Sequence, residues 1–157
     1  MAGIRQNILT NLRTDLALIN GAGSYTNTIG TTFKDVRALE DVSESEFDAA
    51  YVGTLDDVRD QSGEGNVAKW TLSIAGVIYF KSNTDTQNAG TIEAKCETFI
   101  EDLHTLDALW TNTIPTVDAS SKKAVESVEI VTVEPYLNSG FPDRGTIYFE
   151  MKIIYYR

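Results

Sequence analysis

Two stretches of the chain carry apolar side chains at helical spacing. The first repeats at intervals of four and three, at Ile4, Ile8, Leu12, Leu16 and Ile19. The second repeats four, three, four, three and four residues apart, at Ile92, Cys96, Phe99, Leu103, Leu106 and Trp110. This periodicity is typical of a helix with one face against a core. We expect the first helix to stop at residues 20–21, and the second to run from near residues 85–88 to residues 112–115.

Other stretches alternate apolar and polar residues, as half-buried strands do. The clearest is residues 67–81, where one side of the pleat carries Trp70, Leu72, Ile74, Ile78 and Phe80. Residues 28–39 alternate in the same way, and residues 49–55, 125–134 and 146–156 complete the set of expected strands. The order α-β-β-β-α-β-β predicts an α+β fold in one domain over residues 1–157. Its antiparallel or mixed sheet would have about four to five strands, with two helices packed on it.

The final expected strand is apolar on both faces. One face carries Ile147, Phe149, Met151, Ile153 and Tyr155, and the other carries Tyr148, Ile154 and Tyr156. A sheet that is apolar on both faces is covered on both, either by this chain alone or with help from another subunit. The connector at residues 135–145 adds two further aromatic side chains. We take five residues as candidate subunit or partner contacts: Tyr136, Phe141, Tyr148, Ile154 and Tyr156.

Negative charge is concentrated in one segment. The chain has 157 residues, 13 Lys and Arg, and 23 Asp and Glu, for a net charge of −10. Residues 40–64 hold nine acidic residues and one basic residue, which is −8 of that total, and we expect an acidic, loop-rich segment over residues 40–66. The nine are Glu40, Asp41, Glu44, Glu46, Asp48, Asp56, Asp57, Asp60 and Glu64. Binding to duplex DNA requires clustered Lys and Arg, so this composition disfavours a sequence-specific DNA-binding protein.

The sequence shows neither a membrane span nor a secretion signal. No apolar run has the length of a transmembrane helix, and the first residues contain no hydrophobic core of a signal peptide. The single cysteine excludes an intramolecular disulfide bond. We therefore expect no membrane association, and synthesis and folding in a reducing cytoplasm.

Residues suited to catalysis or metal binding are sparse. The only histidine, His104, lies eight residues after Cys96 on the expected second helix, about 12 Å along its axis, so the two cannot act together. Zinc-site and phosphate-loop motifs are absent, and the spacing of the acidic residues matches no calcium loop. We expect no catalytic residue, cofactor or metal. Three carboxylates on the second helix form a line that faces either water or a basic partner surface: Glu93, Glu97 and Glu101.

Several segments, taken in order along nearly the whole chain, resemble one protein family. They are the opening helix at residues 4–16, Gly23-Ser24-Tyr25-Thr26-Asn27-Thr28-Ile29-Gly30, Trp70-Thr71-Leu72-Ser73-Ile74-Ala75-Gly76 with the long helix after it, Val125-Glu126-Ser127-Val128 leading to Val133-Glu134-Pro135, and Gly145-Thr146-Ile147 leading to Ile154-Tyr155-Tyr156-Arg157. The set resembles the tail terminator, or tail completion, proteins of long-tailed bacteriophages. One departure is Asp48-Ala49-Ala50-Tyr51-Val52, where that family has a proline-containing apolar strand.

The resemblance implies a small structural subunit of the virion. Such subunits form a hexameric ring on the head-proximal end of the tail tube, stop tube polymerisation and offer a docking surface for the head connector. The implied partners are further copies of the chain, the tail tube protein and the connector or neck protein. The family is not enzymatic and has no cofactor. The protein is then expected in the virion tail, and in the host cytoplasm before assembly.

DNA passes through such a ring without specific binding. An acidic lumen would repel the phosphate backbone and keep the channel free of tight contacts. We therefore take the acidic residues of segment 40–64 as candidates for a surface that faces the lumen or the tube. The alternative is a loop that only adds solubility.

Three other functions remain open at this point. A neck or head-completion protein also forms a ring and is similarly small. From a different class, a small acidic α+β enzyme or ligand-binding domain would place a pocket and perturbed acids around His104. A DNA-mimicking inhibitor would use the acidic segment, although one cluster on a nearly neutral domain imitates a duplex poorly.

Overall fold

The computed structural model describes residues 3–60, 68–82, 89–113, 125–137 and 143–156. Its two helices are α1 (Ile4–Leu16) and α2 (Ala89–Thr113). Its five strands are β1 (Thr31–Phe33), β2 (Ala49–Asp60), β3 (Lys69–Lys81), β4 (Val125–Tyr136) and β5 (Arg144–Tyr156). Two short 3-10 helices, η1 (Leu39–Asp41) and η2 (Glu44–Glu46), lie between β1 and β2. The predicted order of helices and strands is confirmed.

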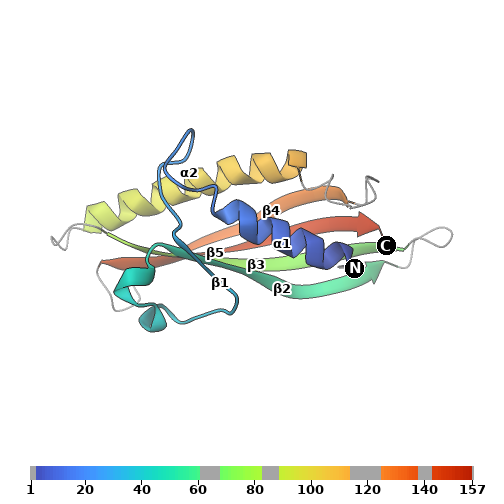
Figure 1. Ribbon diagram of the computed structural model, residues 1–157, viewed down its shortest axis with the longest axis horizontal. Helices are drawn as coiled ribbons and strands as arrows, with labels where there is room; N and C mark the ends of the chain where they lie inside the picture. Colours follow the sequence, from blue (N-terminus) through green and yellow to red (C-terminus); the bar gives the residue numbers. More distant parts are fainter. Residues whose placement is uncertain (1–2, 61–67, 83–88, 114–124, 138–142, 157) are drawn as a thin grey trace.

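The strands form one mixed sheet in the order β1-β2-β3-β5-β4. β1 pairs with β2 in parallel over three residues, and all other neighbours are antiparallel. The four long strands give the molecule its elongated shape (Figure 1). The predicted α+β class, with a mixed sheet and two helices, is therefore confirmed.

Both helices pack on the same face of the sheet, which we call the helix face (Figure 1). The apolar stripes predicted for α1 and α2 enter one core together with alternate side chains of the long strands. Fully buried members include Leu12 and Leu16 from α1, and Phe99 and Trp110 from α2. The strands supply Leu72, Ile74, Ile78, Phe80, Ile147, Phe149, Met151, Ile153 and Tyr155. Periodicity along the sequence thus identified this core correctly.

A glycine in β3 makes room for an aromatic ring on the helix face. Gly76 lies opposite Phe149 of β5, and a Cβ atom built on Gly76 would come within 2.1 Å of the Phe149 ring. The ring therefore rests directly on the backbone of β3, where no side chain fits. This is a close-approach glycine in the interior of a strand.

Three carboxylates on the helices, one of them fully buried, form hydrogen bonds that link the helices to one another and to the rest of the chain. Asp102 of α2 is 1% exposed and accepts hydrogen bonds at 2.9 Å from the backbone amides of Thr26 and Asn27, and from the Asn27 side chain. Trp110 donates to Asp15 of α1 at 3.0 Å. Asp107 accepts from the backbone amide of Ile130 at 3.2 Å, beside the bulge in β4. The apolar stripe alone did not reveal these anchors.

The strand expected at residues 28–39 is wrong for most of its length. Only Thr31–Phe33 pairs with β2, at Ala49–Tyr51. The chain then turns over the other face of the sheet, because Phe33, Leu39 and Val42 bury their side chains there in a small second core with Ala49 and Tyr79. We call residues 34–48 the strap.

Three further boundaries differ from the prediction. The first helix ends at Leu16 and not at residues 20–21, because Ile19 already leaves the helix and accepts a hydrogen bond from the Ile29 amide at 2.7 Å. The segment at residues 56–66, expected as a loop, continues as strand to Asp60, because pairing with β3 extends to Lys69 after a bulge between Thr54 and Asp56. The connector expected at residues 135–145 is shorter, since Pro135 and Tyr136 belong to β4, and Arg144 and Gly145 to β5. Residues 83–88, where the cap of α2 was expected, lie outside the described residues.

Neither described helix is both long enough and apolar enough to span a membrane.

Candidate functional site

The acidic segment does not form a single loop. Glu40 and Asp41 lie on η1, Glu44 and Glu46 on η2, and Asp48 just before β2. Asp56, Asp57 and Asp60 lie on β2, and Glu64 lies outside the described residues. Within the acidic segment expected over residues 40–66, strand β2 extends to Asp60, so the described acidic residues divide between the strap and an extended strand.

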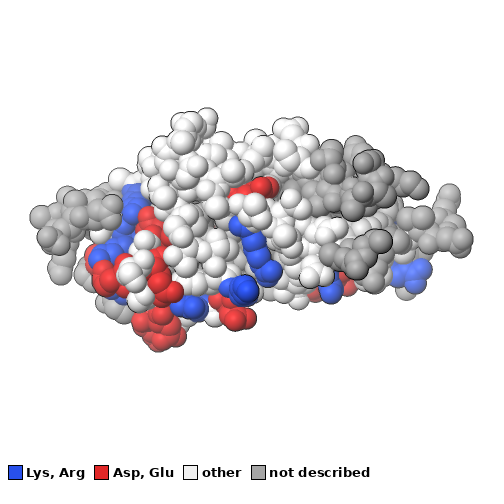
Figure 2. All heavy atoms as spheres, viewed as in Figure 1, with Lys and Arg blue, Asp and Glu red and all other residues white. Residues whose placement is uncertain are grey.

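Basic residues from distant parts of the chain neutralise much of this charge. Glu44 forms ion pairs with Lys81 and Arg144, whose side chains extend from the ends of β3 and β5. Glu46 pairs with Arg37 at 3.0 Å and also accepts hydrogen bonds from Ser43. These contacts lower the pKa of Glu44, first through Lys81, and that of Glu46, first through Ser43. Acidic and basic side chains accordingly intermix where η1 and η2 lie (Figure 2).

Two acidic residues of the segment are mostly buried. Asp48 pairs with Lys95 of α2 at 2.8 Å, with both side chains less than one fifth exposed. Asp57 points to the helix face, where Tyr155 donates to it at 2.7 Å and Arg5 lies 3.6 Å away. Neither is free to face a lumen. Within the described ranges, Glu40, Asp41 and Asp56 are exposed and have no Lys or Arg nitrogen within 4.0 Å.

Within the described residues, no α-helix lies on the face of the sheet opposite α1 and α2, and we call it the open face. The strap covers it only at the β1 end. Four of the five candidate contact residues have defined positions: Tyr136, Tyr148, Ile154 and Tyr156 all point to this face, whereas Phe141 lies outside the described residues. Tyr136 is 52% exposed, and the other three are partly buried. The two faces of β5 are therefore covered differently, the helix face by the chain itself and the open face only in part.

Cross-strand register brings six residues of the open face into two short rows. Each row takes one residue from β3, one from β5 and one from β4. The rows are Val77, Tyr148 and Glu134, and next to them Tyr79, Thr146 and Tyr136. The small Thr146 therefore has a tyrosine on each side across the strands, and a third, Tyr148, two residues along its own strand. A short side chain among three long ones leaves a depression.

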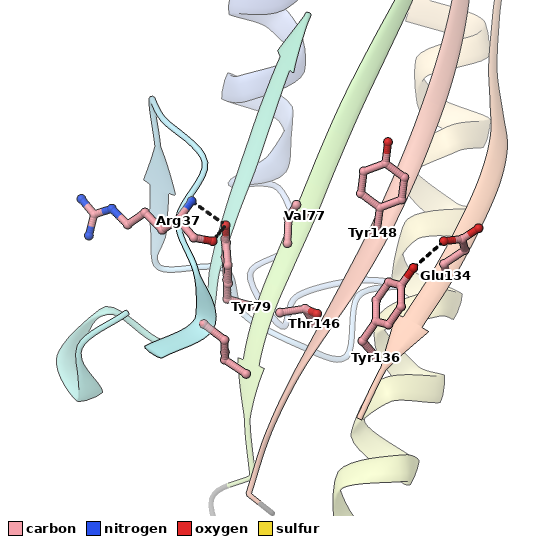
Figure 3. A pocket seen from close by; sticks show the side chains of 8 residues that line it. Arg37, Val77, Tyr79, Glu134, Tyr136, Thr146 and Tyr148 are labelled. Atoms are coloured by element: carbon pink, nitrogen blue, oxygen red, sulfur yellow. Dashed lines mark hydrogen bonds between the residues drawn. The ribbon is translucent and has the colours of Figure 1, made fainter. Parts of the chain in front are cut away.

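This depression is a groove of about 400 Å³. Val77 and Thr146 form its floor, and the three tyrosines lie around it (Figure 3). The strap completes one wall with Arg37 and Leu39, and Glu134 lies on the opposite wall. Two of the candidate contacts, Tyr136 and Tyr148, are thus brought together, while Ile154 and Tyr156 lie toward the other end of β5.

Each tyrosine of the groove has its hydroxyl group engaged within the chain. Tyr79 donates to the carbonyl oxygen of Arg37 at 2.6 Å, Tyr136 to Glu134 at 2.7 Å, and Tyr148 to Glu150 at 2.6 Å. The neighbouring carboxylates raise the pKa of Tyr136, and that of Tyr148 to about 12. The hydroxyl groups therefore stay protonated near neutral pH, and what the groove offers to a ligand is mainly the aromatic rings.

Cys96 and His104 form no reactive pair. Cys96 is 3% exposed in the apolar core, and burial raises the pKa of its thiol to about 11. His104 is exposed on α2 and does not line the groove. Glu93, Glu97 and Glu101 are also exposed on α2. Within the described ranges, no three His, Cys, Asp or Glu residues are arranged to hold a metal ion.

The groove could not be found from sequence periodicity. Alternation places Tyr136, Thr146 and Tyr148 on a common face only once the register between β4 and β5 is known. The signal available in the sequence was Tyr148 on a strand that is apolar on both faces, and Tyr136 as an aromatic residue of the expected connector.

Comparison with known proteins supplies no family for this chain. No protein-family model matches the chain, and no curated protein matches it. The functional argument therefore depends on the sequence and on the geometry described above.

Proposed function

We propose that this protein is a ring-forming virion subunit of the tail terminator type. In this role, six copies cap the head-proximal end of a phage tail tube, stop its polymerisation and offer the surface on which the head connector docks. The observation that carries the proposal is the open face, a sheet surface with aromatic groups that the described residues cover only in part. The resemblance along the sequence supplies the kind of assembly.

The arrangement of the two faces suits a subunit that acts by assembly. The helix face buries a complete apolar core, so the fold does not depend on the open face for most of its buried area. The open face presents Tyr136, Tyr148, Ile154 and Tyr156. Partly exposed aromatic side chains are typical anchors of protein interfaces. Contacts with neighbouring copies, the tube protein or the connector would cover them.

The charge distribution is compatible with DNA passing close to the protein. Six of the ten Lys and Arg residues that the structure describes are held in ion pairs with carboxylates of the same chain, and those residues offer little to phosphates. The surface proposed to face the lumen or the tube is now reduced to Glu40, Asp41 and Asp56. If these residues lay on the outer wall of an assembled ring, the acidic lumen would be wrong.

Electron microscopy tests the proposal. Purified protein, alone and mixed with tubes of the cognate tail tube protein, is imaged in negative stain. We expect six-fold rings at one end of the tubes and an arrest of tube growth. Rings found only on head connectors would instead support a neck or head-completion protein. A protein that stays monomeric with tail tubes and with head connectors would contradict the proposal. That result would favour the alternative of a small ligand-binding domain.

Alanine at Tyr136 and Phe141 tests the contact residues. Tyr136 is exposed, so its truncation should leave the fold intact while weakening association with the ring or the tail. Circular dichroism checks the fold, and the fraction of capped tubes measures association. Unchanged capping by the folded double variant would exclude these side chains as contacts.

A further inference from the structure

The groove on the open face has the chemistry of a cation site. Three tyrosine rings lie around a floor of Val77 and Thr146 (Figure 3). Because the hydroxyl groups of these tyrosines are bound within the chain, a ligand meets the rings themselves. The face of an aromatic ring attracts a cation placed over it. The lining also includes Arg37, but its guanidinium group pairs with Glu46 at 3.0 Å and points away from the groove (Figure 3).

Two carboxylates beside the rings carry charge that no cation of the described chain neutralises. Glu134 and Glu150 each accept one tyrosine hydroxyl. Neither has a Lys or Arg nitrogen of a described residue within 4.0 Å, unlike Glu44, Glu46 and Asp48 on the strap. Glu134 is exposed on the groove wall, directly across from Tyr148. The groove therefore combines ring faces with an available negative charge.

We propose that this groove binds the guanidinium group of an arginine side chain from an extended segment of a different protein. The planar cation would stack on Tyr136 or Tyr148 and form a forked pair of hydrogen bonds with Glu134. Its methylene groups would lie on Val77 and Thr146. Arginine fits better than lysine because only its flat guanidinium can stack on a ring and bind a carboxylate at the same time.

Charge favours a different protein over a second copy of this chain. A copy carries a net charge of −10, and six of its ten described basic residues are already in internal ion pairs. Two such copies repel one another at long range, whereas a basic segment is attracted. The occupant is thus a basic segment of a partner.

This inference takes one premise from the proposed function, namely that the open face makes contacts with other proteins. It specifies one contact, and it requires neither a ring nor a tail. A test on the isolated protein therefore separates its failure from failure of the proposed function.

The test uses a capped pentapeptide with a central arginine between two leucines, and the same peptide with citrulline, the neutral analogue of arginine. Proton–carbon spectra of protein labelled at its seven tyrosine rings report where each peptide binds. We expect the arginine peptide to shift the rings of Tyr79, Tyr136 and Tyr148, and the citrulline peptide to shift them much less. Equal shifts with the citrulline peptide, or shifts confined to other tyrosines, would overturn the proposal.

Single substitutions in the groove show which side chains contribute to binding of the arginine peptide. Glu134→Gln removes the charge but keeps an oxygen for the Tyr136 hydroxyl, and it should weaken the arginine peptide at least about fivefold without affecting citrulline. Tyr148→Leu should weaken it about as much. The matched control is Tyr156→Leu, on the same strand and face, whose hydroxyl also donates to a carboxylate, that of Glu126 at 3.1 Å. It should bind the peptide as wild type does.

Two outcomes of the variant series would reject the proposal. Wild-type affinity in folded Glu134→Gln protein would show that the carboxylate does not bind the cation. The second outcome comes from sedimentation velocity, which measures self-association. If wild-type protein self-associates and Glu134→Gln or Tyr148→Leu abolishes that association while Tyr156→Leu does not, the groove is a contact between copies.

Discussion

The two faces of the sheet differ in how far other described parts of the chain cover them. On β5, Phe149 is fully buried on the helix face, whereas its neighbour Tyr148 on the open face is only partly covered. The helix face is filled by α1 and α2, and its polar groups are buried anchors such as Asp102. The open face has the strap at one end and a groove beside it. One face stabilises the fold, and the described residues leave the other partly exposed.

The largest difference between the faces should come from truncating neighbouring aromatic residues of β5. Phe149→Ala removes a ring packed on Gly76 in the core, and we expect it to lower the free energy of unfolding by about 3–5 kcal/mol. Tyr148→Ala, one residue away, should cost about 1 kcal/mol. Urea denaturation of the two variants measures both values. Equal costs would contradict the division of the sheet into a structural face and a contact face.

A smaller effect is expected from the buried anchor on α2. Asp102→Ala leaves the backbone amides of Thr26 and Asn27 without their acceptor, and it should cost about 2–3 kcal/mol. The control is Glu101→Gln at the next, exposed position, which should change stability by less than about 0.5 kcal/mol. If Asp102→Ala costs no more than this control, the carboxylate does not hold the loop to the helix.

The smallest expected effect is the pH dependence of stability. It should have opposite signs for Asp107 of α2 and for Glu44 of the strap. Burial raises the pKa of Asp107, so this group stabilises the fold most at low pH, and that contribution is lost as pH rises through the raised value. Ion pairs, first with Lys81, lower the pKa of Glu44, so its contribution is present above about pH 4.5 and is lost as pH falls through the lowered value.

Stability curves between pH 3 and pH 7 test these signs. Relative to wild type, Glu44→Gln should lose less stability on acidification, because its neutral amide cannot be protonated. Asp107→Asn should gain stability relative to wild type as pH rises. If the stability difference from wild type changed with pH in the same direction for both variants, the two carboxyl groups would not differ in environment.

The helices and most long strands were predictable because their signal is local. Each stripe or alternation depends only on residues within one element, as in α2 and β3. The strap was not predictable, since its 3-10 helices follow from burial of Leu39 and Val42 against a distant strand. The neutralisation of Glu44 depends on Lys81 and Arg144, which lie 37 and 100 residues away in sequence. The net charge counted over residues 40–64 therefore overstates the negative charge that this part of the folded protein presents.

The candidate site was predictable only in its parts. Tyr136 and Tyr148 stood out as aromatic residues with no place in the predicted core, whereas Thr146 carried no signal. Their combination into a groove arises from the pairing register of β3, β5 and β4. Register is set by the whole sheet, and a single strand does not determine it.

The most direct test of the account compares capping of tail tubes by wild-type protein and by the double variant Tyr136→Ala/Tyr148→Ala. Both proteins are first shown to unfold cooperatively in urea. We predict that wild type forms six-fold rings that cap the tubes, and that the folded variant leaves most tube ends uncapped. Equal capping by the two proteins, or tubes left uncapped by wild type, would contradict the assignment of the open face to assembly.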